Sequence, residues 1–163
     1  MAGAVTGGTG TCLRGMLSFK TEVHCPADKY YSMYKHEVTE LPKLLPFVYG
    51  DIKVIEGDGI SVGSIKQWNY VIDGKPHCVK EKVTEMDDEK RRITHDLFEG
   101  EVMNVYKKFA VILHVKPKKG DIEGVVVKWS VEYEKLNEDS PTPLSYIDVL
   151  DKITRDLNAH LCQ

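Results

Sequence analysis

The chain has 163 residues, of which 42% are hydrophobic and 29% are charged, and this composition fits one globular domain with a sizeable core. Its formal net charge of −3 argues against a nucleic-acid polyanion as the obligate partner. No run approaches the length of a membrane-spanning helix, so we expect no membrane span.

The first residues differ from the rest in composition. Residues 1–14 are rich in glycine, alanine and threonine, and they contain no apolar stretch of the kind that a secretory signal needs. We therefore expect a flexible tail over residues 1–14 and a single domain over residues 15–163.

The four cysteines suggest neither a metal site nor a disulfide framework. They show no Cys-x-x-Cys pairing and no metal-ligand spacing. Free thiols in a reducing cytosol are the favoured interpretation, so we expect a cytoplasmic protein without a metal. These cysteines are Cys12, Cys25, Cys78 and Cys162.

The domain begins with a predicted strand and two short helices. Residues from Leu17 to Cys25 alternate between apolar and polar types, which is the period of a half-buried strand. Pro26 opens a helical pattern over residues 27–38, and residues 40–46 form a second short helix between prolines.

Six further strands follow, separated by turn signals. A glycine-rich link over residues 57–63 joins the first two, Asp73-Gly74 is a tight hairpin signal, and a charged turn surrounds Asp88. The link lacks the Gly-Lys-Ser/Thr end and the following helix of a phosphate-binding loop, so we interpret it as a turn. The expected strands are 51–56, 64–72, 77–85, 91–99, 106–116 and 125–133.

A long amphipathic helix is predicted from Ser140 to Cys162. Apolar residues recur along it at spacings of three and four, while charged residues occupy the other faces. Ser140 or Thr142, each followed by a proline, is a candidate N-cap. The apolar stripe consists of Tyr146, Val149, Leu150, Ile153, Leu157 and Leu161.

This order predicts an α+β fold, in which a seven-stranded antiparallel curved sheet wraps around the long C-terminal helix. Such a meander does not stay flat because strand twist accumulates, and curling around the helix buries the apolar stripe. One helix does not fill the concave side of a bent sheet, so we expect a cavity unless large side chains fill it. The large side chains expected there are Trp68, Tyr70, Phe109, Trp129 and Tyr133.

Several short motifs along the domain are specific enough to suggest a family. They are Trp68-Asn-Tyr70, Asp73-Gly-Lys75, Lys80-Glu81, Phe98-Glu-Gly-Glu-Val-Met103, Tyr106-Lys-Lys-Phe109, Lys128-Trp129 and Tyr133-Glu-Lys-Leu-Asn-Glu-Asp139. Together they resemble the major latex protein branch of the birch-pollen-allergen, or pathogenesis-related class-10, superfamily, over about residues 15–162. The segments Ala27 to His36 and Asn137 to Pro143 look most like the latex proteins of poppies, a group that includes thebaine synthase and neopinone isomerase.

The resemblance implies a helix-grip, START-like fold with a large hydrophobic cavity that binds small plant metabolites, an intracellular location, and an association with stress or defence. We therefore expect a carrier for small hydrophobic metabolites, alkaloid or hormone-like, without a cofactor, and a monomer or weak homodimer. The alternative is a cofactor-independent alkaloid-forming enzyme, similar to the two poppy enzymes. A hormone receptor and a ribonuclease have less support, since neither has a recognisable signature in the sequence.

The strands 77–85 and 91–99 carry the sharpest chemical hypothesis. If their turn centres on Asp88, Glu81 lies opposite His95 on a face that is otherwise aliphatic, and that face is the concave one. The flanking pairs are then Val83 with Ile93 and Val79 with Leu97.

Such a pair can hold a ligand amine or hydroxyl, or it can shuttle a proton in the enzyme alternative. It can equally be a buried pair whose members satisfy one another. Lys66 shares a face with Trp68 and Tyr70, and its amine either meets an acidic or carbonyl group of a ligand or extends to water.

The expected site combines these residues with the apolar lining, and Met103 is placed in it as part of a lid. His95 and Glu81 are the catalytic candidates if the protein is an enzyme. The expected ligand-binding residues are Lys66, Trp68, Tyr70, Val79, Glu81, Ile93, His95, Leu97, Met103, Phe109, Val111, Trp129, Tyr146 and Leu150.

Overall fold

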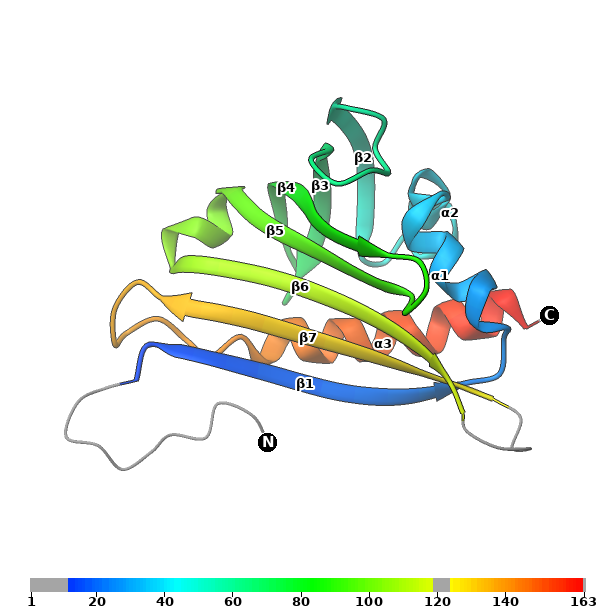
Figure 1. Cartoon of the computed structure of the whole chain (residues 1–163). Coiled ribbons are helices and arrows are strands. Elements are labelled where there is room, and N and C mark those ends of the chain that lie inside the picture. The colour runs from blue at the N-terminus through cyan, green and yellow to red at the C-terminus, as the bar shows by residue number, and fades with distance from the viewer. Residues whose placement is uncertain (1–11, 119–123, 163) are drawn as a thin grey trace.

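A curved antiparallel sheet holds one long helix against its concave face (Figure 1). The computed structural model describes residues 12–118 and 124–162. The strands are β1 (Arg14–Val23), β2 (Tyr49–Glu56), β3 (Ile65–Ile72), β4 (Lys75–Asp87), β5 (Arg92–Gly100), β6 (Tyr106–Pro117) and β7 (Val125–Lys135). The helices are α1 (Ala27–Lys35), α2 (Leu41–Leu44) and α3 (Leu144–Leu161), with the 3-10 turns η1 (Val38–Glu40) and η2 (Glu101–Asn104).

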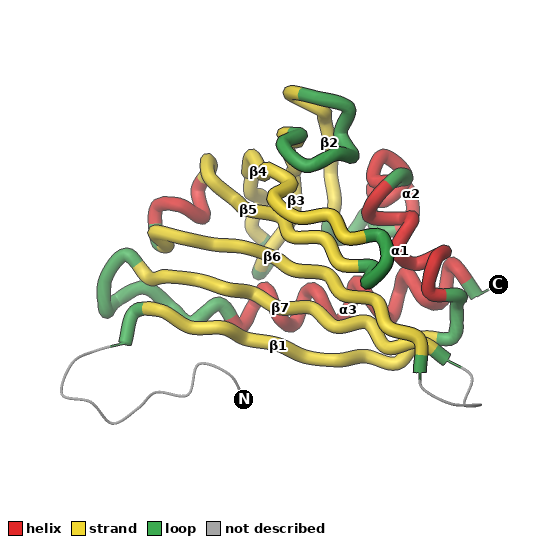
Figure 2. The backbone as a smooth tube through the Cα atoms, viewed as in Figure 1, coloured by secondary structure: helices red, strands yellow, loops and turns green. Residues whose placement is uncertain are grey.

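The sheet order is β1-β7-β6-β5-β4-β3-β2, and every neighbouring pair is antiparallel. The strands β2 to β7 form a meander, and β1 pairs with β7 at its far edge. The predicted α+β fold, with seven strands and a long C-terminal helix, is therefore confirmed. Figure 2 shows the short helices α1 and α2 near the C-terminal end of α3, where the Lys29 amine donates a hydrogen bond to the Leu161 carbonyl at 2.8 Å.

The apolar stripe of α3 packs on the concave face of the sheet, as its spacing predicts. Ile153 and Leu157 are buried, and Thr154 between them is buried as well. The Trp129 indole on β7 donates to the Thr154 hydroxyl at 2.9 Å, and this hydroxyl donates to the Leu150 carbonyl at 2.7 Å. This chain of hydrogen bonds fixes α3 to β7, the strand next to the β1 edge of the sheet, and it pairs both the indole and the buried hydroxyl.

The start of α3 differs from the prediction. The helix begins at Leu144, and Pro143 occupies the N-cap position without a side-chain hydrogen bond, so neither Ser140 nor Thr142 is the cap. A proline disfavours the helical conformation of the residue before it, which keeps Thr142 out of the helix. The segment before α3 is instead tied to the sheet, because the Tyr106 hydroxyl donates to the Pro141 carbonyl at 2.5 Å.

The tail predicted for residues 1–14 overlaps the first strand by one residue. The tail predicted for residues 1–14 lies outside the described residues as far as residue 11, whereas Arg14 is already the first residue of β1. Within the described ranges, no helix is both long and apolar enough to cross a membrane.

Candidate functional site

An apolar cavity of about 100 Å³ lies between α3 and the concave face of the sheet. Most of the predicted ligand-binding residues surround it, namely Trp68, Tyr70, Val79, Glu81, His95, Leu97, Val111, Trp129, Tyr146 and Leu150. The remaining four, Lys66, Ile93, Met103 and Phe109, do not line it. Other lining residues were not predicted as ligand-binding: Tyr34, Val48, Tyr49, Ile72, Val149 and Ile153.

The cavity is small because the large aromatic side chains of the concave face occupy much of the space. Phe109 is fully buried, and its ring lies 4.8 Å from the Tyr146 ring and 5.1 Å from the Tyr106 ring. An apolar protein cavity of about 150 Å³ accepts a benzene molecule. The present cavity is about two thirds of that volume, so even one small ring needs a slight outward movement of the wall, and the space is less than the resemblance implies.

Half of the unpredicted lining residues come from α1 and around the start of β2, and the others come from β3 and α3. The Tyr34 and Tyr49 hydroxyls form a hydrogen bond at 3.1 Å, and the Tyr34 ring packs edge-on against Trp129 at 5.1 Å. The tyrosines of α1 have helical spacing, which places them in the core. That pattern does not show that one of them extends as far as the cavity.

A hydrogen-bonded bridge between the sheet and the helix forms part of the cavity wall. The hydroxyls of Tyr70 on β3 and Tyr146 on α3 are 2.8 Å apart. Burial raises the pKa of Tyr70 to about 12 and raises the pKa of Tyr146 even further above its ordinary value. Both hydroxyls are therefore protonated at neutral pH, and a larger ligand needs this bridge to open.

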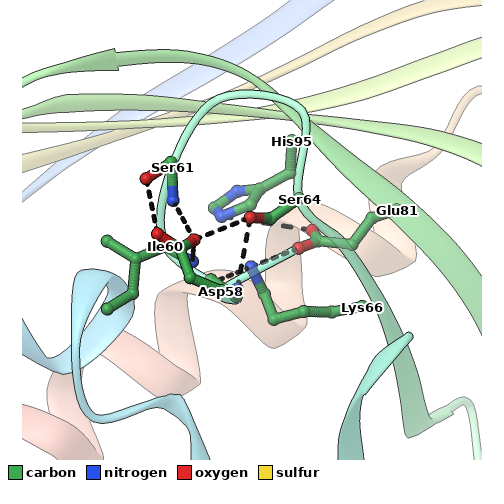
Figure 3. A network of polar contacts seen from close by, with 8 residues as sticks. Asp58, Ile60, Ser61, Ser64, Lys66, Glu81 and His95 are labelled. Atoms are coloured by element: carbon green, nitrogen blue, oxygen red, sulfur yellow. Dashed lines mark hydrogen bonds and ion pairs between the residues drawn. The ribbon is translucent and has the colours of Figure 1, made fainter. Parts of the chain in front are cut away.

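Three polar side chains are buried together in the apolar wall (Figure 3). Lys66, Glu81 and His95 are only 1%, 3% and 4% exposed. The Lys66 amine lies 3.3 Å from Glu81 Oε1, and His95 Nε2 lies 4.0 Å from Glu81 Oε2. The amine of Lys66 also donates to the Gly59 carbonyl at 3.0 Å, so it neither lines the cavity nor reaches water, and both predicted roles for it are wrong.

The glycine-rich link, predicted as a simple turn, places the carbonyl that Lys66 binds. The Asp58 carboxylate accepts hydrogen bonds from the backbone N–H groups of Ile60 and Ser61 and from the hydroxyls of Ser61 and Ser64. These bonds hold the pKa of Asp58 well below its usual range. Gly59 has φ +80°, and a Cβ there would lie 2.7 Å from the Val54 side chain, so this turn requires glycine.

The predicted register between β4 and β5 is wrong by two residues at Glu81 and Val83 and by three at Val79, which pairs with Gly100 instead of Leu97. Glu81 pairs with Leu97, and Val83 pairs with His95, instead of Glu81 with His95. The turn lies beyond Asp88, since Asp87 pairs with Arg92, and irregularities between Val83 and Glu85 and between Lys80 and Glu81 shift the pairing again. A displacement of two residues keeps each side chain on its face, so Glu81 and His95 are still inward-facing neighbours along a diagonal.

Burial sets the protonation state of His95. Loss of solvent lowers the pKa of this imidazole, although the Glu81 carboxylate and a hydrogen bond to the Val111 backbone act in the opposite direction. Because Nε2 has no hydrogen-bond partner and a backbone carbonyl is an acceptor, we assign the N–H to Nδ1. His95 is then a neutral ring that presents an unshared electron pair at Nε2.

We expect folding stability to decrease as the pH falls below about 6.5, the ordinary histidine pKa. A lowered pKa in the folded state means that the unfolded chain binds the proton first, and the loss reaches at most about 1.4 kcal/mol per pH unit. Denaturant unfolding of wild type and His95→Gln between pH 7.5 and 5.5 measures it. The unfolding free energy should fall less steeply with decreasing pH in His95→Gln than in wild type. His24→Gln, at an exposed position, is the control and should behave like wild type. An equal pH dependence in wild type and His95→Gln would refute this assignment.

Two buried polar atoms on residues of the cavity wall, Trp68 Nε1 and His95 Nε2, have no partner among the described residues, whereas Glu81 Oε1 has only its ion pair with Lys66 at 3.3 Å. Leaving such an atom unpaired costs about 1–3 kcal/mol, so a partner supplied by a ligand is favourable. The described residues contain no cluster of histidine, cysteine, aspartate and glutamate that could hold a metal ion. The arrangement is suited to holding an apolar molecule with one polar group.

The comparisons with known proteins agree with this architecture. Residues 12–163 match the model of the Pathogenesis-related protein Bet v 1 family. Major latex protein 146 of Papaver somniferum is 47% identical over 150 residues, which are 92% of each chain.

Two solved structures extend the comparison. The crystal structure of ginseng major latex-like protein 151 from Panax ginseng is 33% identical with a TM-score of 0.88, over 93% of this chain and 99% of that one. Norcoclaurine synthase from Thalictrum flavum, solved with dopamine and hydroxybenzaldehyde, is 26% identical with a TM-score of 0.69, over 96% of each chain. The chain thus belongs to the Bet v 1 family of ligand-binding proteins, and its similarity to the poppy and ginseng proteins places it in the major latex protein branch.

Proposed function

We propose that the protein is a cytoplasmic carrier, associated with defence or stress, that binds one small hydrophobic metabolite of alkaloid or hormone-like type in the cavity beneath α3. The observation that supports this function is an apolar cavity whose wall contains two unpaired polar atoms, Trp68 Nε1 and His95 Nε2. Apolar lining provides affinity, and a few fixed polar groups orient the ligand. The volume of about 100 Å³ favours a small ligand of one ring, and a larger ligand requires side chains of the wall to move.

The ionisable side chains of the wall favour ligand binding without catalysis. A general acid or base works best when its pKa is near the working pH. The lining tyrosines do not meet this condition, because burial raises the pKa of each of them well above its ordinary value. Glu81 is already the ion-pair partner of Lys66, which leaves His95 as the remaining candidate among the described lining residues.

An alkaloid-forming enzyme is the second candidate. It is supported by the similarity to norcoclaurine synthase and by the presence of His95 in the wall, 4.0 Å from Glu81. In this case His95 Nε2 takes a proton from the bound substrate, and the adjacent carboxylate stabilises the resulting imidazolium. No cofactor is needed for such a step.

The two candidates are distinguished by incubating the pure protein with benzylisoquinoline alkaloids, plant hormones, monoterpenoids and fatty acids. Calorimetry measures binding, and mass spectrometry of the recovered compounds measures turnover. The carrier predicts saturable binding at one site per chain, with the ligand recovered unchanged. Turnover that His95→Gln reduces at least a hundredfold, while binding persists, would favour the enzyme.

The controls for this experiment separate charge from folding. The double variant Lys66→Met/Glu81→Gln removes the carboxylate without leaving the lysine unpaired. His24→Gln changes an exposed histidine and should alter neither measurement. If no compound in the panel binds, both candidate functions are wrong.

A further inference from the structure

The charged groups beneath the cavity wall already balance one another. The Lys66 ammonium and the Glu81 carboxylate form an ion pair at 3.3 Å, and both side chains are almost completely buried. Among the described residues that line the cavity, only Glu81 carries a charge when the imidazole of His95 is neutral. A charged ligand would therefore bring an uncompensated charge into a site of low polarity, which is strongly unfavourable.

The wall offers no free counter-ion to a cationic ligand or to an anionic one. An ammonium group would compete with Lys66 for Glu81, while Lys66 keeps its second bond to the Gly59 carbonyl at 3.0 Å. A carboxylate would need Lys66, which does not line the cavity and is already bound to Glu81 and to the Gly59 carbonyl. The wall thus selects against cations and anions alike.

The unpaired atoms also specify the kind of neutral group. Trp68 Nε1 is only a donor and His95 Nε2 is an acceptor, while Glu81 Oε1 is an acceptor that is already paired with the Lys66 ammonium at 3.3 Å. The Trp68 and His95 rings are neighbours, with centroids 6.3 Å apart and planes at 72°. A hydroxyl group both accepts and donates, so it can pair with members of both kinds, whereas a carbonyl or an ether only accepts.

We infer that the cavity selects an electrically neutral, hydroxyl-bearing ring compound, such as a small phenol or a cyclic alcohol, over amines and acids of the same shape. The hydroxyl accepts from the Trp68 indole and donates to His95 Nε2 or to Glu81, and the ring lies against the apolar wall. This inference rests on the proposed binding function and narrows its ligand class.

Four probes of nearly equal shape test the inference on the wild-type protein at pH 7.5: benzyl alcohol, toluene, benzylamine and benzoate. Calorimetry should give benzyl alcohol a dissociation constant about tenfold lower than that of toluene, the value expected for one added hydrogen bond. Benzylamine, as a cation, and benzoate, as an anion, should bind at least tenfold more weakly than benzyl alcohol.

Variants that change the buried charges test whether the Lys66–Glu81 ion pair causes the selectivity against charged ligands. Lys66→Met leaves the carboxylate alone and should shift the preference to benzylamine, and the double variant Lys66→Met/Glu81→Gln should return it to benzyl alcohol. Lys53→Met, at an exposed position on β2, is the matched control and should keep the wild-type order. If the single variant does not fold, the order of the four probes on wild type still carries the test.

Several results would overturn the inference. Benzylamine or benzoate binding wild type as tightly as benzyl alcohol would show that charge is not selected, although the carrier function would still hold. Equal affinity for toluene and benzyl alcohol would show that the hydroxyl has no partner. Binding of none of the four probes would also refute the inference, while the wider panel of metabolites separately decides the proposed function.

Discussion

Lys66→Met is expected to lower the free energy of unfolding by about 3–5 kcal/mol, because it leaves the Glu81 carboxylate buried without its cation. The carboxylate is only 3% exposed, and its other neighbour, His95, is a neutral ring. The Gly59 carbonyl loses its donor as well, which contributes about 1 kcal/mol to this loss. Guanidinium unfolding at pH 7.5, where the imidazole of His95 is uncharged, measures the effect.

The double variant Lys66→Met/Glu81→Gln should recover most of that loss, because two neutral side chains in place of a buried ion pair remove the unpaired charge. Lys53→Met is the control, and a change at this exposed position should stay within about 0.5 kcal/mol. If the single and double variants lose the same stability, the ion pair is not the cause. An unchanged Lys66→Met protein would show that Glu81 has another source of compensation.

Val149→Phe is expected to weaken ligand binding at least a hundredfold, about 2.7 kcal/mol or more. Val149 lies on the face of α3 that lines the cavity, and a phenyl ring at this position occupies the space that a one-ring ligand needs. Adding bulk to a packed core costs about 1–3 kcal/mol, but here the ring enters an existing void, so the stability should change by less than about 1 kcal/mol. Calorimetry and denaturant unfolding measure the two effects.

The matched control is Val126→Phe, which adds the same ring to a half-buried position on β7 that pairs with Glu22 and Lys116 and does not line the cavity. Binding by this variant should equal that of wild type. If Val149→Phe binds its ligand as tightly as wild type does, the ligand lies elsewhere on the protein.

The fold could be predicted because each element has a strong local pattern. Alternation along residues such as Lys66, Trp68 and Tyr70 identifies the inward face of β3, and the apolar stripe identifies the buried face of α3. These patterns follow directly from the periods of strands and helices. Curvature of the sheet around α3 then follows from the need to bury the stripe.

The pairing of β4 with β5 could not be predicted to the residue, because alternation fixes the face of a side chain and not its partner. The irregularity between Val83 and Glu85 leaves no mark in the apolar pattern. Glu81 and His95 were nevertheless placed correctly on one face, since the error is two residues. Periodicity therefore predicts that both residues are buried in the same wall, but it does not predict the two-residue displacement between them along the paired strands.

The role of Lys66 could not be predicted for a different reason. Its partner, the Gly59 carbonyl, is a backbone group, and its position depends on the turn that Asp58 and Ser64 stabilise. Backbone groups carry no signature in the sequence. The cavity volume depends in the same way on how closely Phe109, Tyr146 and their neighbours pack, which the sequence pattern does not determine.

The central claim is that a ligand enters the cavity between α3 and the sheet, and intrinsic fluorescence tests it most directly. The chain has two tryptophans, and both Trp68 and Trp129 line this cavity. Titration with benzyl alcohol should give a saturable change in tryptophan emission, with the same dissociation constant as calorimetry, and Val149→Phe should abolish it. Saturable binding in calorimetry without any change in tryptophan emission, or with a change that Val149→Phe retains, would contradict the account.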